Sequence, residues 1–430
     1  MKTIGMEIRN DRLYLNNIAL TSLVKKYKGP VYVFDEKHLR YNLDIFKNYF
    51  KDKKINCIVE YASKAYISPY LLNVLKEYNF CVDFISLSDL KMIEKSGFDL
   101  SKTVMNGNNK SEEELKLAIK LGVGKIIIDN ITEFKLLVKL AKGKKVHTLF
   151  RVNPGIDTHT HEYVQTSKYA SKFGESIFDK KVLKRISELY KNNENIIFEG
   201  FHAHIGSQIA DEQAYIKLAN IMKEFMEDFE KDYELVVKTI NLGGGFSIKY
   251  KDEDKEFDLK NLLKDIIMVF KSTSLENLII EPGRCIVGDC CFTLYNVGAV
   301  KQTYGKVNYV FVDGGMSDNI RPALYQAKYT IDCVNKINDE KTIKYDVAGK
   351  LCESGDFIGK DIMLPKIRRG DVLIVYCTGA YCFSMSSNYN GLPKGAVIFV
   401  GDKINVASRR EKSDDILKIY NFKEVSNENI

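Results

Sequence analysis

The 430-residue sequence contains no tryptophan and only seven prolines, and it has no long hydrophobic run. A membrane-spanning helix needs about 20 consecutive apolar residues, whereas runs such as VLIVYC and AVIFV have the length of a strand. The N-terminal stretch MKTIGMEIRNDRLYL lacks the apolar core of a signal peptide. We therefore expect a protein that neither enters a membrane nor carries an export signal.

Charge of one sign is also not in large excess. The 64 basic and 57 acidic residues leave a net charge of +7, which does not by itself indicate a nucleic-acid partner. The nine cysteines are an odd number at low density, and no signal peptide precedes them. Free thiols in a reducing compartment fit this pattern best, so we expect a cytoplasmic location.

Several cofactor and metal motifs are missing as well. There is no GxxxxGK[ST] nucleotide loop, no GxGxxG after a strand and no CxxC pair. Two HxH pairs, His159 with His161 and His202 with His204, could each place two imidazoles on one side of a strand. No further ligand motif accompanies them, so we expect no metal. We interpret His202 as a packing histidine and the first pair as part of a polar loop.

The sequence does contain a regular alternation of short β-rich segments and amphipathic helical segments. Helix starts are indicated by Ser68-Pro69 and by Ser111 with Glu114. Such alternation is typical of parallel β/α units, and eight units in roughly 230 residues fit a (β/α)8 TIM barrel, with a doubly wound open sheet as the alternative. The predicted strands are 55–62, 80–86, 102–107, 125–130, 147–153, 198–205, 239–244 and 277–283.

After about residue 285 the pattern changes to strands with short glycine-rich connections. Segments such as CFTLYNVGAVKQ, VNYVFVDGG and DVLIVYCTGAY predict an all-β domain. Residues 1–30 fit poorly as a barrel unit. We therefore expect two domains, namely an α/β barrel over residues 31–285 and a β-barrel or β-sandwich domain formed by residues 1–30 plus 286–430.

Chemically active residue types follow nearly every predicted barrel strand. In this fold the carboxyl ends of the strands form the rim that carries active sites. Chance would scatter these residues over the chain, so the pattern supports the fold and the site together. They are Lys64, Asp83, Ser86, Asn108, Asp129, Arg151, Asn153, His204, Ser207, Gln208, Gly243, Gly244, Gly245, Glu281, Gly283 and Arg284.

Two glycine-rich segments on this rim, NLGGGFS and EPGR, indicate a phosphate site. They can expose backbone N–H groups, and the loops after strands seven and eight are the usual phosphate site of a barrel. A tight turn without a ligand is the structural alternative. Lys64 lies just past a buried-looking strand, where a desolvated lysine can form a Schiff base. A lysine facing a phosphate site indicates pyridoxal 5'-phosphate (PLP) or a sugar phosphate.

The predicted β domain contains two further candidates. Cys352 lies in the polar turn CESGD, so it is a better reactive thiol than Cys57 or Cys333. Arg321 in DNIRPALY could clamp a carboxylate with two hydrogen bonds. A surface salt bridge is the alternative for this arginine.

Motifs along most of the chain resemble those of the diaminopimelate decarboxylase family. The resemblance implies a PLP-dependent decarboxylase with an alanine-racemase-like barrel and a C-terminal β domain. It implies conversion of meso-2,6-diaminopimelate into L-lysine and CO2, the last step of lysine biosynthesis by that route. The segments, in the family's order from about residue 30 onward, are YASKA, GNNKS, RVNPGIDTHTHEYVQTSKYASKFG, HIGSQ, NLGGGF, EPGR, DGGMSDNIRPALY, CESGD and GAYCFSMSSNYNG.

The resemblance also implies roles for the residues of the site. Lys64 would carry the cofactor as a Schiff base, His204 would stack on the pyridine ring, and Glu281 would pair with the pyridine nitrogen. A carboxylate there keeps the ring cationic, which suits decarboxylation. Further cofactor contacts are implied for Asp83, Ser207, Gly244, Gly245, Gly283, Arg284 and Tyr381.

Other positions match those that the family uses around its substrate. Cys352 would donate a proton, and in the family it comes from the partner subunit, which implies a homodimer with shared active sites. Diaminopimelate carries two carboxylates and two ammonium groups, so arginines and Glu353 suit its distal end. The substrate positions are Arg284, Arg321, Tyr325, Glu353 and Tyr381.

Three other functions stay open at this point. Decarboxylases for ornithine, arginine, lysine or a carboxylated polyamine share YASKA-like, GGGF and EPGR elements, although HIGSQ, DNIRPALY and CESGD together favour diaminopimelate. An alanine-type racemase would need a weaker partner than Glu281 at the ring nitrogen. A non-enzymatic PLP carrier would resemble the barrel alone. The chain departs from the family pattern at ISLSDL, at Lys350 and at RREKSDD.

Overall fold

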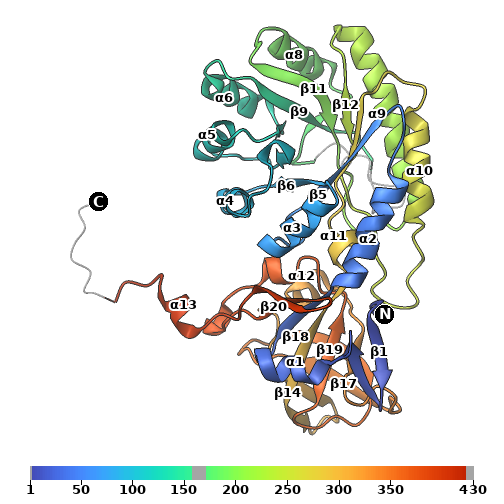
Figure 1. Cartoon of the computed structure of the whole chain (residues 1–430), viewed down its shortest axis with the longest axis vertical. Coiled ribbons are helices and arrows are strands. Elements are labelled where there is room, and N and C mark those ends of the chain that lie inside the picture. Colours follow the sequence, from blue (N-terminus) through green and yellow to red (C-terminus); the bar gives the residue numbers. More distant parts are fainter. Residues whose placement is uncertain (1, 157–170, 423–430) are drawn as a thin grey trace. The chain divides into compact units, whose positions relative to one another are not determined.

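The computed structural model describes residues 2–156 and 171–422. The chain divides into two compact units, which we describe separately (Figure 1). The barrel unit consists of Tyr41–Ile248 and Lys255–Ile286. The β unit consists of Met1–Arg40, Lys249–Asp254 and Val287–Ile430.

The barrel unit is a closed ring of parallel strands. The strand order β9-β11-β12-β13-β5-β6-β7-β8 returns to its start because β8 also pairs with β9. This closure confirms the predicted (β/α)8 barrel and rules out the open sheet. The ring consists of β5 (Asn56–Ala62), β6 (Cys81–Phe84), β7 (Thr103–Met105), β8 (Lys125–Ile128), β9 (Val146–Asn153), β11 (Ile196–His202), β12 (Thr239–Asn241) and β13 (Asn277–Ile280). A short strand, β10 (Glu175–Ser176), pairs with β9.

Helices connect the strands, and their starts follow from local sequence. Ser68 caps α3 and Ser111 forms a capping box with Glu114 in α5, as predicted. In ISLSDL the cap of α4 is Ser86, which pairs with Asp89. The helices are α2 (Glu36–Tyr49), α3 (Pro69–Glu77), α4 (Leu87–Lys95), α5 (Glu112–Leu121), α6 (Ile131–Ala141), α8 (Lys180–Lys191), α9 (Glu212–Tyr233), α10 (Leu259–Phe270) and α11 (Arg284–Val287).

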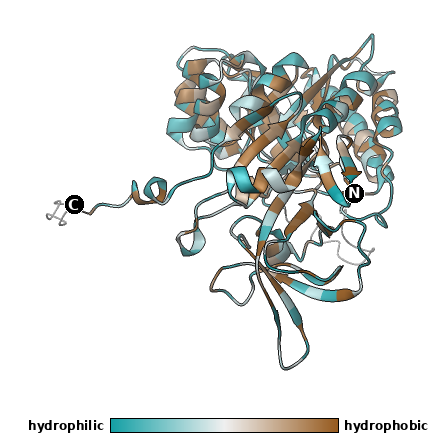
Figure 2. Cartoon of the chain, turned by 60° about the horizontal axis from the view of Figure 1, so that its bottom comes forward, coloured by the Kyte–Doolittle hydropathy of each residue, from teal (hydrophilic) through white to brown (hydrophobic). Residues whose placement is uncertain are grey.

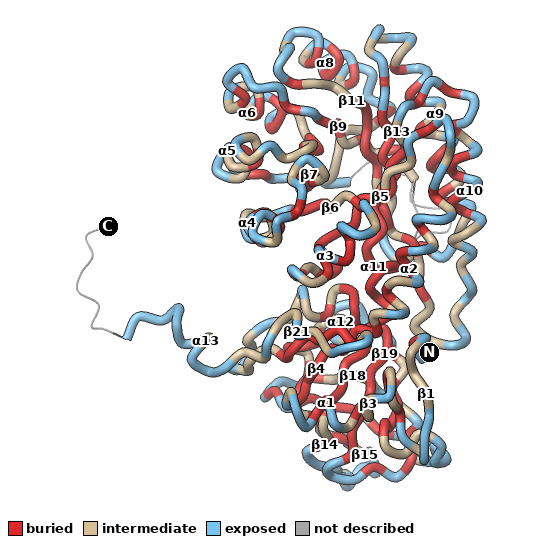
Figure 3. Tube along the Cα trace, in the orientation of Figure 1, coloured by how far each residue is buried: buried red, intermediate tan, exposed pale blue. Residues whose placement is uncertain are grey.

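An apolar layer fills the middle of the barrel. It consists of the buried side chains of Val104, Ile127, Leu149 and Ile279, with the partly buried Ile58 packed against them. Figure 2 shows hydrophobic residues along the barrel strands, and Figure 3 shows buried residues along β5, β11 and β13.

A polar layer follows this apolar layer toward the carboxyl ends of the strands. Side chains alternate along a strand, so the residue two positions further on points to the same side. The residues two positions after the five apolar ones are Glu60, Asn106, Asp129, Arg151 and Glu281. The barrel interior therefore changes from hydrocarbon to charged and amide groups within one layer.

The β unit is built mainly from antiparallel strands. Its large sheet has the order β18-β17-β15-β14-β4-β20-β21, with β19 pairing β14 and β16. The strands are β4 (Val31–Asp35), β14 (Cys291–Gln302), β15 (Asn308–Val312), β16 (Ile331–Cys333), β17 (Ile343–Ala348), β18 (Phe357–Leu364), β19 (Val372–Tyr376), β20 (Ala396–Val400) and β21 (Ile404–Ser408). A separate small sheet holds β1 (Met6–Arg9), β2 (Arg12–Leu15) and β3 (Ile18–Ala19). The unit's helices are α1 (Leu20–Tyr27), α12 (Arg321–Tyr325) and α13 (Ser413–Leu417).

The division into units differs from the predicted domain boundaries at one strand. β4 falls within the range 31–285 assigned to the barrel, but it pairs antiparallel with β14 and parallel with β20. All five residues of β4 are buried, so the strand has the apolar character of a sheet interior. The boundaries 31–285 and 1–30 plus 286–430 themselves stay a prediction. Among the described residues, no helix is long and apolar enough to cross a membrane.

Candidate active site

The carboxylate of Glu281 is the centre of a buried hydrogen-bond network in the barrel unit. Its Oε1 accepts hydrogen bonds from Asn241 Nδ2 at 2.9 Å and Asn106 Nδ2 at 3.3 Å. His202 Nε2 lies 3.3 Å from its Oε2. Burial would raise the pKa of Glu281, but His202 and Lys64 outweigh it and lower the pKa to about 2. The structure thus presents an ionised carboxylate inside the barrel.

Asn241 joins this carboxylate to a second one. Its Nδ2 also donates to Glu60 Oε2 at 3.1 Å, and its Oδ1 accepts from Gly243 N at 2.8 Å. Because the oxygen of the amide is engaged by Gly243, the NH2 group must face the two acids. Burial, and then the charge of Glu281, raise the pKa of Glu60 well above its ordinary value. Glu60 is therefore the neutral acid of the pair.

A third carboxylate belongs to Asp83 in the neighbouring strand β6. It lies next to the segment that carries Lys64, the predicted cofactor lysine. Asp83 Oδ1 accepts from Ser63 N at 2.8 Å, directly before Lys64, and Oδ2 accepts from Asn106 Nδ2 at 3.4 Å. Burial and the charge of Glu281 raise the pKa of Asp83 to about 7, against the opposing charge of Lys64. The side chain of Lys64 itself is exposed.

His204 is held as a neutral imidazole at the end of β11. Its Nδ1 accepts a hydrogen bond from Gly244 N at 3.2 Å, which requires an unprotonated nitrogen. Desolvation by the surrounding groups and the charge of Lys64 lower the pKa of His204 to about 3. The hydrogen bond from Gly244, in the glycine segment that follows β12, therefore fixes the orientation of the imidazole ring.

The glycine segment forms a cradle, a turn packed so closely that a side chain would collide with neighbouring backbone oxygens. A Cβ on Gly244 would lie 1.9 Å from Glu281 O, and one on Gly245 would lie 2.2 Å from Gly206 O. Gly245 has φ +100°, which L side chains rarely adopt. Arg284 Nη2 donates to Ser207 Oγ at 3.2 Å, so a guanidinium and a hydroxyl lie close to one another.

A pocket of about 330 Å³ lies along the same rim. Arg151 contributes to it, with its guanidinium 4.3 Å from the ring centre of Phe173 and 3.8 Å from Asp129 Oδ1. Gly174 N also donates to Asp129 Oδ1 at 3.2 Å. The lining residues are Arg151, Val152, Asn153, Ser171, Phe173, His204, Ile205, Gly206 and Ser207.

In the β unit the structure brings three of the predicted residues together. The Arg321 guanidinium carbon lies 5.4 Å from the ring centre of Tyr325 and 5.8 Å from that of Tyr381. Arg321 Nε donates to Tyr329 OH at 2.9 Å, which fixes the direction of the side chain. Cation–aromatic contacts of this kind hold a guanidinium in place while leaving its NH2 groups for a carboxylate.

The remaining two predicted residues lie in an exposed turn. Cys352 is exposed, whereas the other eight cysteines are buried or half-buried and none forms a disulfide. Cys352 N donates to Asn390 Oδ1 at 2.9 Å, and Glu353 Oε2 accepts from Tyr389 OH at 3.2 Å. Hydrogen bonds from Gly355 N and Tyr389 lower the pKa of Glu353. The turn therefore presents a thiol and an ionised carboxylate to solvent.

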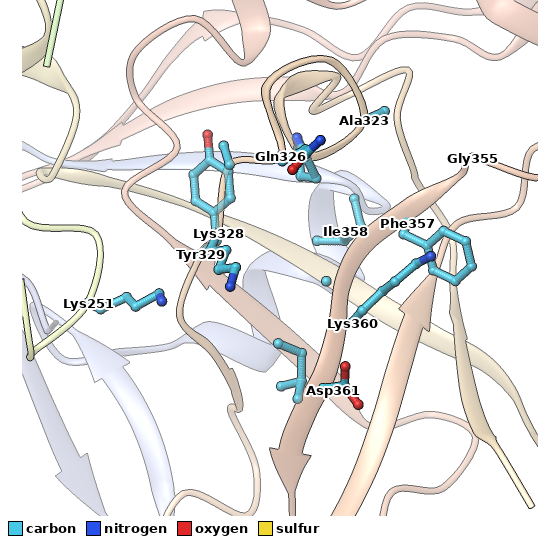
Figure 4. Close-up of a pocket in the computed structure, with 14 residues that line it drawn as sticks. Lys251, Ala323, Gln326, Lys328, Tyr329, Gly355, Phe357, Ile358, Lys360 and Asp361 are labelled. Carbon is cyan, nitrogen blue, oxygen red and sulfur yellow. The ribbon is translucent and has the colours of Figure 1, made fainter. Parts of the chain in front are cut away.

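A pocket of the β unit lies elsewhere (Figure 4). Its volume is about 670 Å³, and it runs between the segment after α12 and the start of β18. Lys251, Lys328 and Lys360 contribute ammonium groups to it. None of the predicted site residues lines it.

Sequence reasoning missed part of the site. It selected Asn108, which is exposed, whereas the amide that reaches Glu281 is Asn106. It also treated His202 as a packing residue, although the ring contacts Glu281. The signal was the alternation of side chains along the strands, which places Asn106 two residues after the apolar Val104. Among the described residues no group of three ligating side chains could hold a metal, and His159 and His161 lie outside them.

The class of the protein follows from the barrel and its cradle together with a family match. Residues 37–288 match the family described as "Pyridoxal-dependent decarboxylase, pyridoxal binding domain". The cofactor of this class is pyridoxal phosphate, and the residues present fit it. Glycine-rich turns after the last barrel strands suit a phosphate group, and the ionised Glu281 is a suitable partner for a protonated ring nitrogen.

Similar proteins cover nearly the whole chain. Diaminopimelate decarboxylase from Bacillus subtilis (strain 168) is 37% identical over 420 residues, which is 96% of this chain and 95% of that protein. The same enzyme from Staphylococcus aureus (strain COL) is 38% identical, covering 92% of this chain and 94% of that protein. The crystal structure of diaminopimelate decarboxylase from M. jannaschii in complex with L-lysine has a TM-score of 0.90 at 28% identity, covering 97% of each chain. The chain belongs to the diaminopimelate decarboxylase family.

Proposed function

We propose that the protein decarboxylates meso-2,6-diaminopimelate to L-lysine and CO2, as the last step of lysine biosynthesis by that route. The observation that carries the proposal is the similarity to diaminopimelate decarboxylases over more than nine-tenths of the chain, which includes both units. One solved relative is described as a complex with L-lysine, the proposed product. A related fold with only 20% identity, a lysine/ornithine decarboxylase from Vibrio vulnificus, supports the fold alone.

We propose that the barrel residues bind and polarise the cofactor. Lys64 would hold its aldehyde carbon, Glu281 its ring nitrogen, and His204 the face of its ring. When bound, pyridoxal phosphate supplies an electron sink for the pair left at Cα as CO2 departs. Glu281 keeps the ring nitrogen protonated because its own pKa is low. The further proposed cofactor contacts are Asp83, Ser207, Gly244, Gly245, Gly283 and Arg284 in the barrel unit and Tyr381 in the β unit.

We propose that residues of the β unit, together with Arg284 of the barrel unit, recognise the distal end of the substrate. The substrate's distal carboxylate suits the guanidinium groups of Arg284 and Arg321, and its distal ammonium suits the ionised Glu353. The Cys352 thiol is exposed and would donate a proton to Cα after CO2 has left. Tyr325 and Tyr381 complete the proposed set through their contacts with Arg321.

The proposal includes a cytoplasmic homodimer in which Cys352 serves the partner's site. All nine cysteines are free thiols, as expected in a reducing compartment. A complementation experiment tests the shared site. Lys64→Ala and Cys352→Ala should each be inactive alone, and mixing and refolding them together should restore activity, because a mixed dimer contains one intact set of residues. Activity that stays absent in the verified mixed dimer would contradict sharing.

The test of the function is substrate discrimination combined with the cofactor spectrum. We expect a visible absorbance band for bound cofactor that is lost in Lys64→Ala and retained in Lys116→Ala, which changes an exposed lysine. We expect CO2 release from meso-diaminopimelate and none from L-lysine, L-ornithine or L-arginine. Release from one of the others would transfer the function to a related decarboxylase. A band without release would favour a racemase or a carrier.

A further inference from the structure

Asp356 is a buried acidic residue that the proposed mechanism does not use. It lies four positions after Cys352 and is only 3% exposed. Its Oδ1 accepts a hydrogen bond from Met316 N at 2.6 Å, and its Oδ2 accepts one from Leu351 N at 2.8 Å. Each carboxylate oxygen thus binds the backbone of a different segment.

Two glycines allow these segments to approach the carboxylate. A Cβ on Gly315 would lie 2.4 Å from Asp356 Oδ1, and a Cβ on Gly349 would lie 2.2 Å from Asp356 Oδ2. Contacts this short do not occur for real side chains, so both positions require glycine while the carboxylate is in place. Gly349 N also donates to Asp356 O at 3.0 Å.

One of the two segments leads to Arg321. After Met316, Ser317 O accepts from Ser387 N at 3.0 Å, and Asn319 Oδ1 accepts from Arg321 N at 3.3 Å at the start of α12. The backbone of the helix that carries Arg321 is therefore tied to the segment that the Asp356 carboxylate holds.

The other segment is the turn that presents Cys352 and Glu353. Leu351, bound to Asp356 Oδ2, directly precedes Cys352. On the far side of the turn, Asp356 N donates to Glu353 O at 3.2 Å. The same residue therefore fixes the turn through its side chain before Cys352 and through its backbone after Glu353.

We propose that Asp356 is a positioning residue that sets the Cys352–Glu353 turn and the Arg321 helix in one fixed arrangement. It acts through the backbone N–H groups of Met316 and Leu351, which donate to its two carboxylate oxygens. This inference rests on the proposed function, because it gives Cys352, Glu353 and Arg321 their importance. It extends that function by naming the group on which both substrate-binding segments depend.

The test compares Asp356→Asn with Asp361→Asn. The asparagine replaces one acceptor oxygen by an NH2 group that faces a backbone N–H, so one segment loses its hydrogen bond. We expect kcat/KM for meso-diaminopimelate to fall about 10- to 100-fold, the range for one charged hydrogen bond. Bound cofactor per subunit should stay unchanged. Asp361, whose side chain is 73% exposed, provides the control and should leave kcat and KM unchanged.

A second readout needs no substrate. The rate at which iodoacetamide alkylates Cys352, measured against Cys352→Ser as a blank, reports the geometry of the turn. We expect Asp356→Asn to change this rate severalfold and Asp361→Asn to leave it unchanged. An unchanged alkylation rate together with an unchanged kcat/KM would overturn the inference. If Asp356→Asn changes the alkylation rate but the wild-type protein releases no CO2 from diaminopimelate, the result would contradict the proposed function and not the positioning role of Asp356.

A measurement on the unmodified protein covers the case in which Asp356→Asn does not fold. Native-state hydrogen exchange of the Met316 and Leu351 amides should give equal opening free energies, because one carboxylate holds both. Clearly different values for the two amides would contradict a common anchor.

Discussion

Replacing Asn241 by leucine would test the buried network around Glu281 most directly. Leucine has nearly the shape of asparagine but can neither donate nor accept. The substitution removes the 2.9 Å bond to Glu281, the 3.1 Å bond to Glu60 and the 2.8 Å bond from Gly243 N. The bond to the ionised carboxylate is worth about 1.5–3 kcal/mol and each of the others about 0.5–1.5 kcal/mol. We expect a loss of about 3–6 kcal/mol in the free energy of unfolding of the apoprotein.

Part of this loss of stability comes from the bond that Asn241 donates to the ionised form of Glu281. Removing a donor worth about 1.5–3 kcal/mol would raise the pKa of Glu281 by about 1–2, since one pKa unit corresponds to about 1.4 kcal/mol. The carboxylate should stay ionised at neutral pH, but it loses the donor that fixes its orientation toward a protonated ring nitrogen. We therefore expect weaker binding of pyridoxal phosphate in addition to the lower stability.

Urea unfolding of the apoprotein and titration with pyridoxal phosphate, followed by absorbance, measure the two effects separately. Asn220→Leu is the matched control, because Asn220 is exposed on α9 and bonds only to its own helix through Ile216 O. It should change the free energy of unfolding by less than about 0.5 kcal/mol. A loss below about 1 kcal/mol in Asn241→Leu, with normal cofactor affinity, would refute the reasoning.

Three further substitutions test other parts of the barrel. Glu60→Gln should lower the free energy of unfolding by less than about 1 kcal/mol at pH 7, because Glu60 is buried as a neutral acid. The raised pKa of Glu60 also makes the wild type lose stability as pH rises above about 4.3. Urea unfolding across pH should therefore show a weaker decline of stability in the variant. Gly243→Ala places a Cβ 2.7 Å from His204 Nδ1 and should cost about 1–3 kcal/mol in thermal unfolding while weakening cofactor binding. Lys110→Met should cost about 3–5 kcal/mol because it leaves the buried Glu133 without its 2.7 Å partner, and adding Glu133→Gln should recover most of that loss in urea titrations.

The features that sequence reasoning predicted correctly are those that short segments encode. Strand–helix alternation gave the barrel, and Ser68 and Ser111 gave two helix starts. The glycines of NLGGGF were assigned to the rim because their freedom is visible in the residue type alone. Each of these inferences needs only neighbours in the chain.

The features that were missed depend on distant segments. The importance of Asn241 and Glu60 depends on the pairing of β12 with β13 and of β13 with β5, which brings three strands side by side. Both residues lie in predicted strands, but their residue types alone do not show that their side chains meet inside the barrel. The apolar run VYVF of β4 is compatible with a strand of a barrel and with a strand of a sandwich, so composition alone does not assign it to a unit.

The position of β4 has a consequence for the order in which the protein is completed on the ribosome. β4 is made early, but its two partners, β14 and β20, begin at Cys291 and Ala396. Synthesis proceeds at about 5–20 residues per second, so β4 waits on the order of tens of seconds for its second neighbour. The barrel strands, which end with β13 at Ile280, emerge during this interval. The nascent chain therefore carries the apolar strand β4 without its full set of partners while the barrel that follows it can already close. Chaperone binding near the N-terminus would protect β4 until β20 is made.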